Sequence, residues 1–275
     1  MKHSIKAAAI GALAAFAFSA QAAMVTQWSY SVATQWVTSG VGAPTFSPGG
    51  GSQTVTPSML SWGSSIGDAD PASNSGRSGL KILNSPQNNT TGGLLTNDVL
   101  NPDLVATFQH VNNSISGDYA TLLKASVLTT ITLTPHAPSG SALAPMPLTF
   151  NINFTETPNT SGSCIPEATS VCDDIFVLTG GNLNQTFAYD GYTYFVSFLD
   201  MQSGPLTPLS PQACTTAGAP VNCLGFWTAE GASETVDFGI VISSTPMSVP
   251  EPGVLALVGL SLLGAAGASR RRRRN

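Results

Sequence analysis

The feature that most constrains the fold of this chain is a recurring alternation of apolar and polar residues with a period of two. One face of residues 27–36 carries Trp28, Tyr30, Val32, Thr34 and Trp36, while polar residues occupy most of the positions between them. Residues 127–134 and 148–154 repeat the alternation. Successive side chains of a β-strand point to opposite faces. Each run therefore predicts a strand with one buried face and one solvent-exposed face.

Residues typical of turns separate the predicted strands. Asp190 and Gly191 lie between two aromatic-rich runs, and this pair suits the positive φ angles of a two-residue hairpin turn. Residues 235–242 supply a last strand, and a weak helical periodicity is confined to residues 118–125. We expect exposed loops at residues 39–57 and 138–147, which are rich in Gly, Pro, Ser and Ala. The pattern predicts an all-β fold, a single β-sandwich or jelly-roll-like domain.

The charge distribution excludes a nucleic-acid-binding protein. Only 9% of the 275 residues are charged, against roughly 25% in an average soluble domain, which also argues against an ordinary cytosolic enzyme. Five of the ten basic residues are the arginines at 270–274, and Lys2 and Lys6 lie at the other end. The interior has three basic against fourteen acidic residues, a difference of −11. This sign is wrong for binding a phosphate backbone.

The N-terminal segment predicts export. Residues 1–22 combine the basic Lys2 and Lys6 with an apolar stretch and an Ala20, Gln21, Ala22 cleavage pattern, as in a secretory signal peptide. The alternative is a membrane anchor, but its apolar stretch of about twelve residues is too short to span a bilayer.

The C-terminal segment has three ordered parts. A β-sandwich domain over residues 23–242 and a linker over 243–249 precede the triplet Pro250, Glu251 and Pro252. Residues 253–269 are an apolar, charge-free stretch that would form a helix of about 25 Å, only marginally long enough to span a membrane. The arginines at 270–274 should halt translocation and stay cytoplasmic.

This order of triplet, apolar helix and arginine cluster over residues 250–275 resembles the PEP-CTERM sorting signal of Gram-negative bacteria. The resemblance implies a substrate of exosortase, a membrane-embedded transpeptidase that processes such proteins. The chain would then enter the inner membrane transiently and reach the cell envelope, outer surface or extracellular matrix. An ordinary C-terminal anchor with an incidental Pro-Glu-Pro is the alternative.

The four cysteines predict disulfides. Cys164, Cys172, Cys214 and Cys223 are an even number in an exported chain, and they lack the close pairs that a zinc site needs. We favour local pairing of Cys164 with Cys172 and of Cys214 with Cys223, because short loops close most readily. The other two connectivities stay open.

Two histidines, His110 and His136, lie beyond the signal peptide, and neither occurs in a known catalytic motif. His110 sits where a strand runs into an Asn-rich turn that includes Asn112 and Asn113. We expect a structural role, in which the imidazole and the amides hydrogen-bond the turn backbone. A role for His110 in binding a ligand is the alternative.

Residues 109–115 resemble the signature of the THxN family of PEP-CTERM proteins, although Gln109 stands where that family has Thr. The remaining matching segments are residues 61–63, 78–80, 133–135 and 225–230, together with the two cysteine pairs. This resemblance implies an exported surface protein and assigns no catalytic residue.

Two further side-chain groups have alternative interpretations. The pairs Asp68 with Asp70 and Asp173 with Asp174 could donate oxygens to calcium, but no complete calcium loop is present. We therefore expect no cofactor and no metal, with calcium as the alternative. An exposed face of Trp28, Tyr30 and Trp36 could stack on sugars, but an aromatic stripe is more often half of a sandwich core.

Together these observations predict a non-enzymatic surface protein that is structural or adhesive. Its association with exopolysaccharide and biofilm is implied by the family resemblance, because such sorting systems are often linked with exopolysaccharide production. The alternatives are a carbohydrate-binding module that uses Trp28, Tyr30 or Trp36, and, further off, a secreted hydrolase that uses His110.

Overall fold

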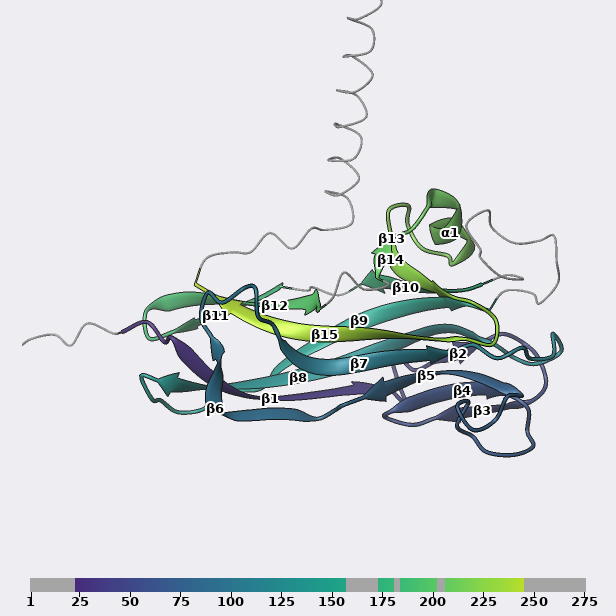
Figure 1. Ribbon diagram of the computed structural model, residues 1–275, viewed down its shortest axis with the longest axis horizontal. Helices are drawn as coiled ribbons and strands as arrows, with labels where there is room; N and C mark the ends of the chain where they lie inside the picture. The colour runs from purple at the N-terminus through teal and green to yellow at the C-terminus, as the bar shows by residue number, and fades with distance from the viewer. Residues whose placement is uncertain (1–22, 157–172, 181–183, 202–205, 245–275) are drawn as a thin grey trace, which may run out of the picture.

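Two antiparallel β-sheets face each other across a common core (Figure 1). The computed structural model describes residues 23–156, 173–180, 184–201 and 206–244. Core residues come from both sheets, including Trp28 and Leu133 from one and Leu60 and Ile240 from the other. The prediction of an all-β sandwich is confirmed.

The first sheet has the strand order β13-β14-β10-β9-β8-β1-β6, and β2 pairs with β8. Its strands are β1 (Gln27–Trp36), β2 (Thr45–Phe46), β6 (Gln87–Leu95), β8 (Leu122–Ala137), β9 (Met146–Thr155), β10 (Asp174–Gly180), β13 (Thr207–Pro208) and β14 (Leu224–Thr228). All pairs between these strands are antiparallel.

The second sheet has the order β11-β12-β15-β7-β5-β4-β3. Its strands are β3 (Ser52–Val55), β4 (Met59–Gly63), β5 (Arg77–Leu83), β7 (Asp103–Val111), β11 (Asn184–Tyr189), β12 (Tyr192–Asp200) and β15 (Ser233–Ser243). Strand β7 lies between β15 and β5, where His110 is opposite Glu234 on one side and Leu80 on the other.

The aromatic stripe of β1 belongs to the core. Trp28 is fully buried, Trp36 is 1% exposed and Tyr30 is 8% exposed. The Trp28 ring makes an edge-to-face contact with Tyr194 at a centroid distance of 5.0 Å. The suggestion that these three aromatics form a sugar-binding platform is therefore wrong, because the opposite sheet covers them.

The predicted hairpin is present. Strands β11 and β12 pair directly, with Tyr189 opposite Tyr192. The two turn residues, Asp190 and Gly191, have φ angles of 50° and 79°. Positive φ at both positions is typical of a type I′ turn, which matches the twist of the flanking strands.

Three segments differ from the sequence expectations. Residues 118–125 form no helix, because the chain turns there and enters β8 at Leu122. Residues 39–57 are not all loop, since β2 and β3 pair with β8 and β4. A short helix, α1 (Pro211–Thr216), begins after Ser210, whose side chain accepts a hydrogen bond from the Ala213 N–H.

The first and last described segments meet at one end of the sandwich. Thr96 Oγ1 donates to the Val25 carbonyl at 2.7 Å, and the neighbouring Asn97 N–H donates to the Ile242 carbonyl at 2.8 Å. The loop from β14 into β15 and the end of β7 lie at the opposite end, at the right of Figure 1. The long axis of the sandwich therefore separates the two chain ends from that loop.

No helix within the described ranges is both long and apolar enough to cross a membrane. The predicted signal peptide, with Ala20 and Ala22, and the predicted segment 250–275 lie outside the described residues.

Candidate functional site

Three carboxyl groups meet at the end of the sandwich that is remote from the chain termini. One oxygen each from Glu156, Asp174 and Glu230 lies within 4.8 Å of the other two. Neighbouring strands bring them together: Glu156 directly follows β9, Asp174 begins β10 opposite Thr228, and Glu230 follows β14. We call Glu156, Asp174 and Glu230 the acidic cluster.

The side chain of His110 reaches the acidic cluster from the opposite sheet. Its Nε2 lies 3.7 Å from Asp174 Oδ2, and its ring packs edge-to-face on Phe154 at a centroid distance of 4.9 Å. His110 is 1% exposed, and neither ring nitrogen has a hydrogen-bond partner within the described part of the chain. Burial lowers its pKa to about 3, so the imidazole is neutral at physiological pH.

Glu156 is held by an indole. The Trp62 Nε1–H donates to Glu156 Oε2 at 2.7 Å, while Oε1 has no hydrogen-bond partner among the described residues. Burial raises the pKa of Glu156 to about 8, and the charge of Glu230 also raises it. The hydrogen bonds with Trp62 and with Asp174 lower it in part. Without a cation in the cluster, Glu156 therefore keeps a proton at neutral pH.

Glu230 is positioned by the segment that follows His110. Burial raises its pKa, hydrogen bonds from Asn112 and Ser114 lower it, and the charge of Asp173 raises it. The Asn112 side chain also donates to the Thr228 carbonyl at 2.8 Å, which ties the end of β7 to the end of β14. The buried Asp174 and the partly buried Glu156 and Glu230 thus share a small space, which is costly unless protons or cations offset their charge.

The Asn-rich segment makes the expected amide hydrogen bonds, but the imidazole does not. Asn113 Nδ2 donates to the Arg77 carbonyl at 2.7 Å and to the Pro71 carbonyl at 2.9 Å. The His110 ring instead points into the interior, because His110 is still part of β7 and lies on its inner face. The expected hydrogen bonds from the ring to the turn backbone are absent from the described structure.

Several segments that carry the THxN resemblance converge on this region. Trp62 from residues 61–63 contacts Glu156, and Ser78 from residues 78–80 donates to the Asn113 carbonyl. Glu230 closes the segment 225–230. Sequence reasoning singled out His110 and Asp174 but missed Glu156 and Glu230. Glu230 could have been found because it ends a matching segment, whereas no sequence signal points to Glu156.

The other proposed calcium donors lie in a turn. The Asp68 carboxylate accepts from the Asp70 N–H at 3.0 Å, and the Asp70 carboxylate accepts from the Ala72 N–H at 2.9 Å. Asp70 also forms an ion pair with Lys81 at 2.6 Å. These carboxylates stabilise a loop, and the cluster of potential metal ligands found within the described ranges is the acidic cluster.

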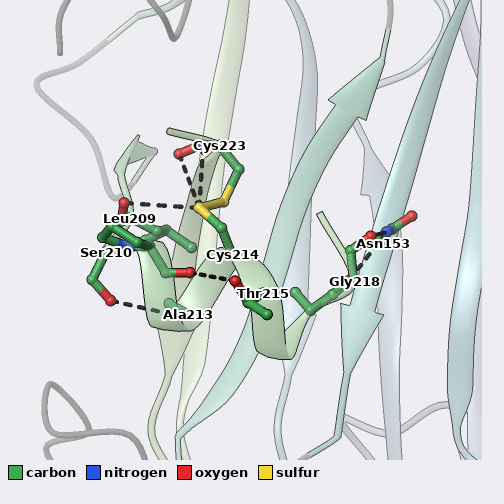
Figure 2. Close-up of a disulfide and its surroundings, with 10 residues drawn as sticks. Asn153, Leu209, Ser210, Ala213, Cys214, Thr215, Gly218 and Cys223 are labelled. Atoms are coloured by element: carbon green, nitrogen blue, oxygen red, sulfur yellow. Dashed lines mark hydrogen bonds between the residues drawn. A yellow bond between two sulfur atoms is a disulfide. The ribbon is translucent and has the colours of Figure 1, made fainter. Parts of the chain in front are cut away.

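One predicted disulfide is confirmed. Cys214 and Cys223 are bonded and tie α1 to the start of β14 (Figure 2). Their small apolar cluster includes Ile175 and Leu209, and it lies beside the main core. Cys164 and Cys172 lie outside the described residues.

A separate groove of about 390 Å³ lies on the outer face of β8, β9 and β10. Its polar lining comes from Thr45, Lys124, Ser126, Asn151, Asn153 and Thr179. Part of this lining is preorganised, because Ser126 Oγ donates to Asn151 Oδ1 at 2.8 Å.

Residues 248–273 match a family model described as the PEP-CTERM protein-sorting motif. The chain therefore carries an exosortase sorting signal. The PEP-CTERM motif marks a protein that is exported through the membrane, processed by exosortase and located in the cell envelope or at the surface. The match includes Pro250, Glu251 and Pro252, and it starts four residues after Ser244, the last described residue. The search of curated proteins found no match to the chain.

Proposed function

We propose that this PEP-CTERM protein is a non-enzymatic structural or adhesive component of the bacterial surface that associates with exopolysaccharide in the extracellular matrix. The observation that carries the proposal is the sorting motif at residues 248–273, which begins within five residues of the end of β15 at Ser243. The sandwich is therefore the part that the sorting pathway delivers.

The surroundings of His110 support a non-enzymatic role. A hydrolase that used this histidine would need a hydroxyl or thiol within hydrogen-bond reach of the ring, in a cleft open to substrate. Within the described residues the ring has no hydrogen-bond partner, and its side chain is fully buried. Burial of Trp28 and Trp36 likewise removes the aromatic platform of a carbohydrate-binding module.

Attachment through the C-terminal side would direct the opposite end of the sandwich outward. Glu234, opposite His110, and Ile242, near the end of β15, are eight residues apart on one strand, or about 26 Å. A protein attached through its C-terminal side would hold the acidic cluster about that far from the point of attachment. The outer groove at Asn151 and Thr179 runs along the side and offers amides, hydroxyls and one ammonium group to a glycan.

The test compares cell fractions of three strains: wild type, a strain that lacks the sorting enzyme, and a strain that lacks exopolysaccharide. We expect the protein in the surface or matrix fraction of wild type, in the inner membrane without the sorting enzyme, and in the medium without exopolysaccharide. Retention in the inner membrane of all three strains would contradict the proposal.

A second experiment addresses the glycan contact. Binding of the exported protein to purified exopolysaccharide should weaken in the double variant Asn151→Ala/Thr179→Ala, which removes two groove side chains. Gln53→Ala, an exposed change on β3 of the other sheet, is the matched control and should bind normally. Equal binding by both variants would place the glycan contact elsewhere.

A further inference from the structure

The acidic cluster combines one buried carboxyl group, that of Asp174, with the partly buried carboxyl groups of Glu156 and Glu230. The sequence between residues 23 and 244 has three lysine and arginine residues, and the structure places them elsewhere. The Arg77 guanidinium donates to Ser61 Oγ and to the Ser64 carbonyl, Lys81 pairs with Asp70, and Lys124 lines the outer groove. Protons or a cation from solution would offset the charge of the cluster.

The environment of His110 favours a cation over protons. Its ring is buried at the edge of the cluster, and both nitrogens lack hydrogen-bond partners within the described structure. An unsatisfied buried polar group normally costs about 1–3 kcal/mol, and such a group in a native protein calls for an explanation. A cation in the cluster would satisfy Nε2, while Nδ1 would stay without a hydrogen-bond partner among the described residues.

We propose that Glu156, Asp174, Glu230 and His110 bind one divalent transition-metal cation, with Zn²⁺ as the preferred ion. The carboxyl oxygens lie within 4.8 Å of one another, and His110 Nε2 is 3.7 Å from Asp174 Oδ2. Around an ion with bonds of about 2.1 Å, neighbouring ligand atoms lie about 3.0–3.4 Å apart. Coordination by all four groups would need the carboxyl oxygens to close in and the His110 ring to move toward them, because Nε2 is not within 4.8 Å of all three oxygens.

The donor set determines the class of cation. Calcium takes six to eight oxygen ligands and does not use imidazole, whereas zinc and manganese accept mixed nitrogen and oxygen donors. For a given site of this kind, affinity rises from manganese to zinc. The expected order of affinity is therefore Zn²⁺, then Mn²⁺, then Ca²⁺.

The surrounding residues would hold the ligands in place. Trp62 hydrogen-bonds Glu156, Asn112 hydrogen-bonds Glu230, and Phe154 packs on the His110 ring. His110 comes from the sheet that contains β7, while Asp174 comes from the sheet that contains β10. A bound cation would therefore cross-link the two sheets at the end remote from the termini. The inference is independent of the proposed matrix role, because it concerns the folded sandwich alone.

The test uses the processed protein isolated from wild-type cells. Its metal content is measured by elemental mass spectrometry, and its thermal unfolding is followed after EDTA treatment and after addition of Zn²⁺, Mn²⁺ or Ca²⁺. We expect close to one equivalent of metal, and a rise in Tm of about 5–10 °C when free Zn²⁺ is a hundredfold above its Kd. Mn²⁺ should act more weakly, and Ca²⁺ should have little effect.

Variants separate this site from adventitious binding. Glu230→Gln keeps the size of the side chain and removes one anionic ligand, so it should raise the Kd for Zn²⁺ at least tenfold, and His110→Ala should do the same. His136→Ala is the matched control, because that exposed histidine lies outside the acidic cluster. If His110→Ala does not fold, Glu230→Gln decides the question.

A protein that neither contains metal nor gains stability from Zn²⁺ would overturn the proposal. A larger rise in Tm with Ca²⁺ than with Zn²⁺ would also overturn it, as would a Kd for Zn²⁺ that is unchanged in Glu230→Gln.

Discussion

Burial shifts the pKa values of two side chains at the candidate site in opposite directions. The pKa of His110 falls from 6.5 to about 3, and that of Glu156 rises from 4.5 to about 8. Below pH 6.5 the unfolded chain binds a proton on His110 that the folded protein does not bind. The free energy of unfolding therefore decreases as the pH is lowered from 6.5 toward 3. Above pH 4.5 the unfolded chain releases a Glu156 proton that the folded protein keeps, so stability falls as pH rises toward 8. The two effects oppose each other between these limits.

We therefore expect the metal-free protein to be most stable between about pH 4.5 and 6.5. Urea denaturation of the EDTA-treated protein from pH 3 to 8 measures this profile. In His110→Gln the loss of stability below pH 4.5 should be smaller, while the loss toward pH 8 should remain. Asp174, whose Oδ2 lies 3.7 Å from the ring, and the other two members of the acidic cluster are unchanged in this variant. If the parent protein and His110→Gln lost the same stability below pH 4.5, the lowered pKa of His110 would be contradicted.

The Asn113 side chain should stabilise the loop around Pro71. Its amide donates to the carbonyls of Pro71 and Arg77, and both hydrogen bonds are partly buried. Asn113→Ala leaves two carbonyls without this partner and should lower the free energy of unfolding by about 1–3 kcal/mol. Asn101→Ala, which removes an exposed hydrogen bond to Asp98, is the control and should cost under about 0.5 kcal/mol. Equal losses for the two variants would refute this account.

At the scale of elements, the Cys214–Cys223 disulfide ties α1 to the edge of the first sheet. The bond closes a short loop with a sequence separation of 9 residues. In the chain-entropy model, replacing both cysteines with serine should lower the free energy of unfolding by about 2–3 kcal/mol. Urea denaturation measures this, and a double variant as stable as the parent protein would show that the bond does not stabilise the fold.

The β11–β12 hairpin depends on the conformation of its turn. Gly191 has a φ of 79°, and no atom lies within 4 Å of the position that a Cβ would take, so an added side chain would cause backbone strain without a clash. Gly191→Ala should therefore cost about 1–2 kcal/mol. Gly117→Ala is the control, because that position has equal space and no positive φ. Urea denaturation compares the two, and a loss in Gly191→Ala no larger than in the control would contradict the turn assignment.

The sequence predicted elements whose signals are local. Alternation over residues 127–134 and 148–154 lies within β8 and β9, and the Asp190 and Gly191 pair marks the hairpin. Strand β3 was missed because its segment is rich in Gly, Ser and Pro and is ordered by pairing with β4. Helix α1 was missed although Ser210 followed by Pro211 is a recognised helix start.

The candidate site was harder to predict than the fold. His110 was recognisable from its motif, but its burial depends on the opposite sheet. Glu156 and Glu230 meet only because β9, β10 and β14 are neighbours, and this strand order cannot be obtained from local patterns. Sequence reasoning therefore found two members of the site without their partners.

In the whole molecule, the first and last described residues lie together at one end of the sandwich. Val25 and Ile242 are held side by side through Thr96 and Asn97, and the acidic cluster lies at the other end. The sorting motif at residues 248–273 follows directly, so cutting the chain there would leave the sandwich intact. Processing at Pro250, Glu251 and Pro252 is the step that the account requires.

The most direct test is the intact mass of the protein purified from wild-type cells and from cells that lack the sorting enzyme. We predict a wild-type chain that begins near residue 23 and ends near residue 250, with or without an attached group. Without the sorting enzyme, the chain should extend to Asn275. Recovery of a chain ending in Asn275 from both strains would contradict the account, because the C-terminal segment would then be a permanent anchor.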